Sequence, residues 1–399
     1  MTPDMPYDDP HDDGGTNTDS IMPTDNQQEI INTIALTRIN YFSLNGMLEL
    51  YRRLGSATAV MEHRNDIRDI VPEASPRLAD ALKDMSGPLR IAEAELRYDE
   101  EHGITPLTMN DTRYPSRLRE CGDAPLMLFY KGNADLNRTR VLSIVGTRHC
   151  TAYGQDLIRR FCDDLRQICP DVLIISGLAY GVDICAHRNA LRTGFDTAAV
   201  LAHGLDTVYP SSHRETACEM TSHGGLITEF LTQTNADKVN FVRRNRIVAG
   251  MADATLLVES AAHGGGLITT GIAQSYGRDV FAFPGAVGMA YSEGCNRLIR
   301  DNGAALITCA ADLAASMAWD SDQALLHARQ QGIERQLFPE LTGDERLIVA
   351  TLAKTNDMQT NMLAARSGIP VQRMSALLFS LEMKGVVKMY AGGIYHLLQ

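Results

Sequence analysis

Short apolar segments alternate with longer helical segments between residues 141 and 310, and this alternation constrains the fold of the chain. The apolar segments carry few polar side chains, which indicates strands that are covered on both faces. Seven such strands are predicted: 141–145, 172–175, 198–202, 225–228, 254–258, 279–283 and 305–308. Strands that alternate with helices predict an α/β fold with a doubly wound, mostly parallel sheet.

A small N-terminal helical domain is expected at residues 27–105, where apolar residues recur every three or four positions. One helix is predicted from Ile30 to Leu54, with Gly55 as its stop. Shorter helices are predicted near 56–63, 76–85 and 87–102. Residues 71–83 look like part of a helix–hairpin–helix, a unit that either binds nucleic-acid backbones or simply packs on a neighbouring domain.

A C-terminal winged helix is expected at residues 342–399. Thr342 and Glu345 form a capping box at the start of its first helix. Three helices are predicted before a final hairpin: 343–354, 359–366 and one that begins at Pro370. The third helix offers only Arg373 and Lys384 as cations, so contact with a protein, or packing alone, stays open beside DNA reading.

The remaining segments complete the expected division of the chain. Residues 1–26 hold seven aspartates and no Lys or Arg, and they predict a disordered acidic tail. Residues 106–311 form the sheet domain, which opens with a connection that contains a strand at 123–132. Residues 312–341 are predicted to be a linker.

The chain is acidic overall, with a formal net charge of −12, which argues against coating nucleic acid through bulk charge. Much of that charge lies in the tail, so a locally basic site remains possible. The eight cysteines form no C-x-x-C pair and no zinc spacing, as expected for reduced thiols. Neither a signal peptide nor an apolar run of membrane length is visible, so a cytoplasmic location is expected.

One basic stretch stands out against this acidity. Residues 237–250 read DKVNFVRRNRIVAG and gather Lys238, Arg243, Arg244 and Arg246 around an aromatic side chain. Cations beside an aromatic ring suit single-stranded nucleic acid, because they neutralise phosphates while the ring stacks on a base. The same pattern also fits the solvated start of a helix with local salt bridges.

Glycine-bearing turns follow several of the predicted strands. Four can be identified: 146–148, 176–183, 203–206 and 264–270. In an open parallel sheet, ligands bind beyond the carboxyl ends of the strands. Glycine allows the backbone to approach a ligand closely, and free N–H groups at helix starts hold phosphate. Several such turns at one edge favour a phosphate-bearing ligand.

Known cofactor and catalytic motifs are missing from this region of the sequence. It contains neither G-x-G-x-x-G nor G-x-x-x-x-G-K-[ST], so a bound dinucleotide or a hydrolysed ATP is not supported. Asp183 is expected to cap a helix or fix its loop. Glu259 follows an apolar strand and is the more ambiguous candidate for a catalytic acid, but no catalytic motif organises it.

A set of motifs occurs in one order along two hundred residues. They are SIVGTR (143–148), SGLAYGVDICAH (176–187), LAHGLDTVYP (201–210), TEF (228–230), KVNFVRRNRIVAG (238–250), GGGLITTGIA (264–273), GRDVFAFPG (277–285) and GCNRLIRDNGA (294–304). From about Tyr114 to Ala311 the chain resembles the DprA/Smf family of DNA-processing proteins. The helical front and the winged tail also resemble that family's layout.

The resemblance implies a Rossmann-like domain that binds single-stranded DNA. It also implies a homodimer that loads the recombinase RecA onto strands covered by single-strand binding protein, in natural transformation. No cofactor, metal or catalytic residue is expected. Carried over to this sequence, the implied DNA-binding residues are Gly146, Thr147, Arg148, Ser176, Gly177, Lys238, Phe241, Arg244, Arg246 and Gly265.

Each of these residues has an implied role. Arg148 and Lys238 are expected to contact phosphates, and Phe241 is expected to stack on a base. The glycines, with Thr147 and Ser176, are expected to line the phosphate pocket through N–H and hydroxyl groups. Of Arg244 and Arg246, one could instead brace the loop, as Asn245 could.

The sequence departs from the family pattern at three positions. Gly264 and Gly266 stand where the family usually has serines on either side of a glycine, so hydroxyl contacts are expected to be missing there. Val242 replaces the usual proline after Phe241, which is expected to loosen a turn. These changes remove no charge.

Two other classes of function stay open at this point. The first is a Rossmann-like enzyme that cleaves nucleoside monophosphates to base and ribose phosphate, with Glu259 as a candidate catalytic residue. Such enzymes carry a P-G-G-x-G-T-x-x-E run, whereas this chain lacks the proline before Gly264 and the glutamate after Thr270. The second is an interaction scaffold, in which the helical front and the winged helix bind proteins.

Overall fold

The computed structural model describes residues 24–39, 44–319, 341–390 and 393–398. The chain divides into two compact units, residues 1–319 and 320–399. Residues 1–23 of the predicted tail (1–26) and residues 320–340 of the predicted linker (312–341) lie outside the described residues. None of the described helices combines the length and apolar character that a membrane span requires.

The first unit is built on a mixed sheet that, in the described residues, has nine strands. All seven predicted strands are confirmed close to their expected bounds: β3 (Val141–Val145), β4 (Leu173–Ser176), β5 (Thr197–Val200), β6 (Gly224–Thr228), β7 (Ala254–Leu257), β8 (Asp279–Ala282) and β9 (Ala305–Leu306). These seven are mutually parallel. The strand predicted at 123–132 is β2 (Met127–Gly132), which runs antiparallel to β6. The sequence did not predict β1 (Thr105–Thr108), which pairs with β2 at the sheet edge.

The order of the strands contains one reversal. The sheet reads β1-β2-β6-β5-β4-β3-β7-β8-β9. From β3 the chain therefore steps outward through β4, β5 and β6, and then returns to add β7, β8 and β9 on the other side of β3. A crevice forms at such a reversal, since the connections on its two sides lead away in opposite directions.

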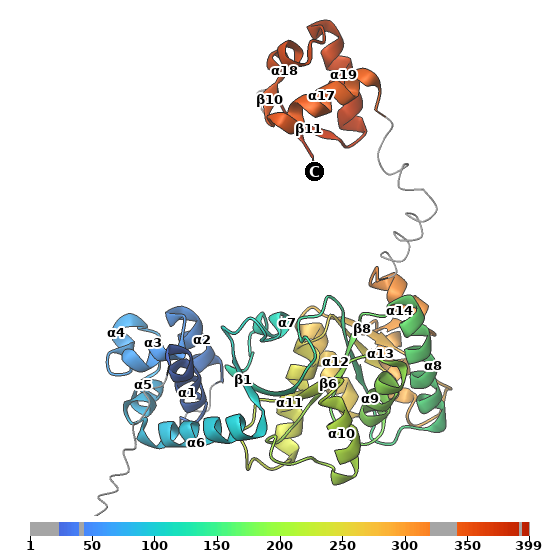
Figure 1. The fold of residues 1–399 in the computed structure, drawn as a ribbon. Coiled ribbons are helices and arrows are strands. Elements are labelled where there is room, and N and C mark those ends of the chain that lie inside the picture. The colour runs from blue at the N-terminus through green and yellow to red at the C-terminus, as the bar shows by residue number, and fades with distance from the viewer. Residues whose placement is uncertain (1–23, 40–43, 320–340, 391–392, 399) are drawn as a thin grey trace, which may run out of the picture. The chain divides into compact units, whose positions relative to one another are not determined.

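Helices cover both faces of this sheet (Figure 1). On one face lie α8 (Ala152–Ile168), α9 (Val182–Thr193), α10 (Arg214–Met220) and α14 (Ala310–Ser316), which pack on inward side chains such as Leu142 and Ile144. On the other lie α11 (Lys238–Gly250) and α12 (Gly265–Ser275). Three short elements complete the unit: α7 (Ser116–Arg119), the 3₁₀ turn η1 (Ser211–His213) and α13 (Glu293–Arg300).

The helical front differs from its prediction in one respect. The single helix expected from Ile30 to Leu54 is wrong, because α1 (Asp25–Thr37) ends at Thr37 and α2 (Leu44–Leu54) begins seven residues later. Both helices bury their apolar faces in one core. Apolar residues therefore recur at helical spacing in both α1 and α2, which is why the sequence reads as one helix. Four further helices follow: α3 (Ala57–Glu62), α4 (Ile67–Ile70), α5 (Pro76–Lys83) and α6 (Ser86–His102).

The helical front shares a continuous core with the edge of the sheet. Ile34 and Leu50 from the front belong to the same buried cluster as Leu107 of β1 and Leu128 of β2. The packing therefore joins these segments into one body, and the boundary predicted at 105 stays a prediction.

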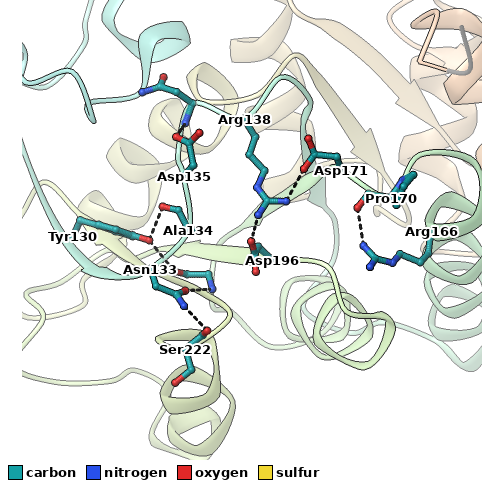
Figure 2. A network of polar contacts seen from close by, with 12 residues as sticks. Tyr130, Asn133, Ala134, Asp135, Arg138, Arg166, Pro170, Asp171, Asp196 and Ser222 are labelled. Carbon is teal, nitrogen blue, oxygen red and sulfur yellow. Dashed lines mark hydrogen bonds and ion pairs between the residues drawn. The ribbon is translucent and has the colours of Figure 1, made fainter. Parts of the chain in front are cut away.

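Polar contacts tie together the amino ends of the parallel strands (Figure 2). Arg138, just before β3, forms ion pairs with Asp171 before β4 and Asp196 before β5; the contact with Asp171 is 2.8 Å. Asn133 donates to the carbonyl oxygen of Ser222, which precedes β6, at 2.6 Å. These contacts fix the loops that lead into β3, β4, β5 and β6 at this end of the sheet.

The second unit is the predicted winged helix. It contains α17 (Gly343–Lys354), α18 (Thr360–Ser367) and α19 (Val371–Met383), with a small sheet of β10 (Met358–Gln359), β11 (Val387–Tyr390) and β12 (Ile394–Leu397). The capping box of Thr342 and Glu345 is present at the start of α17. Ile348, Leu378 and other buried residues give this unit its own core.

Candidate nucleic-acid interface

A cavity of about 700 Å³ opens at the carboxyl ends of β3, β4 and β7. Its walls are the loops after β3 and β4, the amino-terminal half of α11 and the start of α12. Because β3 and β7 are the strands at which the sheet reverses its order, the cavity occupies the position where doubly wound sheets bind ligands.

An aromatic ring lies at the centre of the cationic part of this cavity. The ring of Phe241 is half-buried, and the exposed Arg148 places its Cζ 5.0 Å from the ring centroid. The Arg244 Cζ lies 6.0 Å from the same centroid. Lys238, one turn earlier on α11, is exposed at the rim. The predicted cations and the predicted ring are therefore brought together, although they come from segments about ninety residues apart.

The geometry of α11 sorts the basic stretch onto two faces. Asp237 caps the helix by accepting from the N–H of Asn240 at 2.8 Å. Lys238, Phe241 and Arg244 then recur every three residues and line the cavity. Arg243 and Arg246 lie on the opposite face, where both donate to Glu229, at 2.8 and 2.6 Å.

Two of the predicted contacts lie outside this cavity. Arg246 is buried, pairs with Glu229 and donates to the carbonyl oxygen of Asp123. The hydroxyl of Ser176 is buried and donates to the carbonyl oxygen of Ile144 at 2.6 Å. The other eight predicted residues line the cavity. The N–H of Thr147, however, already donates to the carbonyl oxygen of Glu259, at 2.8 Å.

Arg244 forms the buried end of the cavity. Its guanidinium donates to the carbonyl oxygen of Val200 and, at 3.2 Å, to the side-chain oxygen of Asn245, which therefore braces it. Burial lowers the pKa of Arg244, whereas the neighbouring Asp183 raises it. Burial likewise raises the pKa of Asp183, and Arg244 lowers it. The two charges compensate each other beneath the cavity.

The glycines of the cavity serve two different purposes. A Cβ on Gly177 would overlap the Arg244 guanidinium, and one on Gly146 would lie 2.6 Å from Val182 Cγ2, so close packing requires both glycines. Gly265 faces open space. It begins α12, and in the described part of the chain its N–H and that of Gly266 have no acceptor. These are free donors of the kind that hold phosphate.

The structure shows what surrounds the three positions that depart from the family pattern. A Cβ on Gly264 would overlap the Ser260 hydroxyl, and one on Gly266 would lie 2.7 Å from Leu257 Cδ1. Serines at these two positions would therefore require their surroundings to shift. Val242 lies inside α11, so the expectation of a loosened turn at this position is wrong.

Two buried ionisable side chains next to the cavity, the candidate acid Glu259 and His187, hold loops in place. Glu259 is buried and accepts from the N–H and the hydroxyl of Thr151 at 2.8 and 2.6 Å, which fixes the start of α8. His187 is buried, with Nε2 2.5 Å from the carbonyl oxygen of Gly177. Burial lowers the pKa of His187 to about 4, so the ring is neutral and donates to that oxygen. These contacts give both side chains a structural role that requires no catalytic function.

Some cavity residues were not predicted from the sequence. His149 and Tyr291 line the wall opposite α11, with ring centroids 6.1 Å apart. Tyr209 does not line the cavity, but its ring centroid lies 6.0 Å from that of Phe241. His149 follows Arg148 directly and could have been suggested by that motif. Tyr291 and Tyr209 lie in loops, where no periodicity relates them to the site.

Comparisons with known proteins place the chain in one family. A model of the family described as DNA recombination-mediator protein A matches residues 105–318. A model of the DprA winged helix domain matches residues 334–393. The family models thus cover both the sheet with its cavity and most of the second unit.

Individual relatives extend the match. Protein Smf of Escherichia coli (strain K12) is 32% identical over 337 residues, which cover 82% of this chain and 87% of that protein. DNA processing protein DprA of Streptococcus pneumoniae (strain R6) is 37% identical over 205 residues, which cover 51% of this chain and 71% of that protein. The X-ray structure of the S. pneumoniae protein aligns with a TM-score of 0.61 and 29% identity, over 74% of this chain and 98% of that one.

Proposed function

The chain belongs to the DNA recombination-mediator protein A family, also named DprA/Smf, and we propose that it binds single-stranded DNA in the cavity at β3, β4 and β7. The observation that carries this proposal is the convergence of Arg148, Lys238 and the ring of Phe241 on one cavity. Exposed cations neutralise phosphates, and an aromatic ring stacks on any base, so the site suits a strand without regard to sequence.

The bottom of the cavity adds a second kind of phosphate contact. The free N–H groups of Gly265 and Gly266 point from the start of α12, where the helix dipole favours an anion. Arg244 lies deeper in the cavity, where the nearby Asp183 offsets part of its positive charge. The strand would therefore be held by exposed cations at the rim and by backbone donors within.

The finer parts of the proposal come from the family. We propose that the protein acts in the cytoplasm as a homodimer and loads RecA onto strands covered by single-strand binding protein, in DNA uptake or another recombination pathway. It would do so as a mediator and not as an enzyme. The phosphoribohydrolase alternative loses its support because Glu259, its candidate acid, is held by Thr151.

The binding proposal can be tested by titrating labelled oligonucleotides of mixed sequence at two salt concentrations. Arg148→Ala and Lys238→Ala should each weaken binding about tenfold, for all sequences alike, since each removes a charge-assisted contact to phosphate. Each should also flatten the slope of log affinity against log salt by about 0.7, as expected for one phosphate on a single strand.

A matched control is Arg300→Ala, which removes an exposed cation that pairs with Asp301 and does not line the cavity. It should leave affinity and salt slope unchanged. Wild-type affinity of the Arg148→Ala/Lys238→Ala double variant would overturn the site. A parallel assay for release of free base from nucleoside monophosphates would detect the enzymatic alternative.

A further inference from the structure

A second, apolar cavity lies next to the cationic one, at the carboxyl ends of β7 and β8. It measures about 920 Å³ and is bounded by the start of α8 and by the loop after β8. Its principal side chains are Tyr153, Pro284, Met289 and Tyr291. We propose that this apolar groove receives a base of the same DNA strand whose phosphates the cationic cavity holds, an inference that rests on the proposed function.

The groove and the cationic cavity share a wall. Tyr291 lines both of them, and its ring stacks with that of His149, which also lines the cationic cavity. On the other side, the chain passes from Arg148 in the cationic cavity to Thr151 in the groove within three residues. A strand held at Arg148 therefore reaches the groove without leaving the protein surface.

The chemistry of the groove suits a base and not a phosphate. No Lys or Arg is among the residues that line it. Its one carboxylate, Glu259, is buried and occupied by Thr151. Tyr153 and Met289 are 52% and 58% exposed despite their apolar character. An aromatic ring and an adaptable thioether are suitable surfaces for a planar base of any identity.

The groove is already formed without a ligand. The hydroxyl of Tyr153 donates to the carbonyl oxygen of Pro284 at 3.0 Å. Asn296 holds the next residue, Gly285, by accepting from its N–H at 3.0 Å and donating to its oxygen at 2.9 Å. The carbonyl oxygen of Tyr291 accepts from the N–H of Ser260 at 2.7 Å. Because these walls are fixed, a base can enter with little ordering cost.

The test uses the full chain and an oligothymidine in which one abasic nucleotide is moved along the sequence. Tyr153→Ala/Met289→Ala should weaken binding of the intact strand about tenfold while the salt slope stays at the wild-type value, because stacking neutralises no phosphate. One abasic position should weaken wild type by a similar factor and have no further effect on the variant. Tyr153→Phe keeps the aromatic ring, so this variant should bind the intact strand with the affinity of wild type, unlike Tyr153→Ala.

Val287→Ser is the matched control, since Val287 lies in the same loop, is 97% exposed and does not line the groove. Thermal unfolding of each variant separates a folding defect from a binding defect. Wild-type affinity of Tyr153→Ala/Met289→Ala, or a flattened salt slope, would overturn the base subsite. If Arg148→Ala still weakens binding in that case, the proposed function stands; if it does not, the proposed function itself fails.

Discussion

Two glycines in the cavity allow binding and folding to be separated at single residues. Gly265→Ala adds a methyl group in open space at the first position of α12, so unfolding free energy should stay the same or rise by up to about 1 kcal/mol. The methyl group would occupy space beside the free N–H groups at the start of α12, where a phosphate would bind, so affinity for single strands should fall several-fold. Gly177→Ala instead overlaps buried Arg244 and Asp183, and it should cost about 1–3 kcal/mol of stability.

Urea unfolding and oligonucleotide titration of both variants check this contrast. A Gly265→Ala protein that binds like wild type would show that the start of α12 holds no phosphate. A Gly177→Ala protein of wild-type stability would contradict the close packing around that glycine.

Arg244 is expected to matter for folding more than its position in a binding stretch suggests. It is buried, donates to the carbonyl oxygen of Val200 and offsets much of the charge of the buried Asp183, so Arg244→Ala should cost about 3–5 kcal/mol. Lys238→Ala, on the exposed part of the same helix, should change stability by less than about 0.5 kcal/mol. Thermal unfolding distinguishes the two, and equal melting temperatures for both variants would contradict the buried pair.

The sequence predicted most residues of the site, but it did not predict which face of α11 each basic side chain occupies. The basic stretch, the ring and the glycine turns were recognisable as residues, and eight of the ten candidates line one cavity. Arg246 differs from Arg244 by two positions, which turns it away by about 200° on a helix. That rotation directs Arg246 to Glu229, a partner whose position depends on tertiary packing and so could not be predicted from sequence.

At the scale of elements, the apolar parallel strands were the most predictable features. Their composition is dictated by burial on both faces, so β3 to β9 were all expected. The helix predicted over residues 30–54 failed because α1 and α2 bury their apolar faces in the same core, and periodicity alone does not record a break between them. β1 was missed because Thr105, Pro106 and Thr108 give it little apolar character.

The helix α6 carries a buried carboxylate that should make stability depend on pH. Asp99 is 1% exposed, and neither of its side-chain oxygens has a hydrogen-bond partner in the described structure. Burial, together with the nearby Glu95, raises the pKa of Asp99 to about 8. Since the folded state holds this proton and the unfolded state releases it near pH 4, stability should fall as pH rises from about 4 to about 8.

Asp99→Asn keeps the shape of the protonated side chain and removes this titration. The difference in unfolding free energy between variant and wild type should shift in favour of the variant by up to about 1.4 kcal/mol per pH unit in that window. Urea unfolding at pH 5, 7 and 9 measures it. Glu93→Gln is an exposed change on the same helix, and its unfolding free energy should follow that of wild type at a constant offset across this pH range. If Asp99→Asn also kept a constant offset from wild type, the raised pKa of Asp99 would be contradicted.

At the scale of the whole molecule, the two units have separate cores and different surfaces. The first holds the cavity with its exposed cations. In the second, the two cations at the predicted recognition helix are already paired, Arg373 with Asp344 at 2.5 Å and Lys384 with Glu345 at 2.8 Å. Phe379 and Met383 leave α19 with an apolar exposed face instead. The helix α19 is therefore poorly suited to supply phosphate contacts.

A truncated chain that ends after Trp319 should consequently keep the DNA site intact. Because no described core residue of the first unit belongs to the core of the second, its melting transition should persist unchanged. Its affinity for a short single strand should stay within about threefold of the full chain, with the same salt slope, since phosphate contacts set that slope.

Residues 342–399 alone should bind neither single strands nor duplexes in the same titration. A flatter salt slope after truncation would mean that the second unit neutralises phosphates, and the paired state of Arg373 and Lys384 would then have to open on binding.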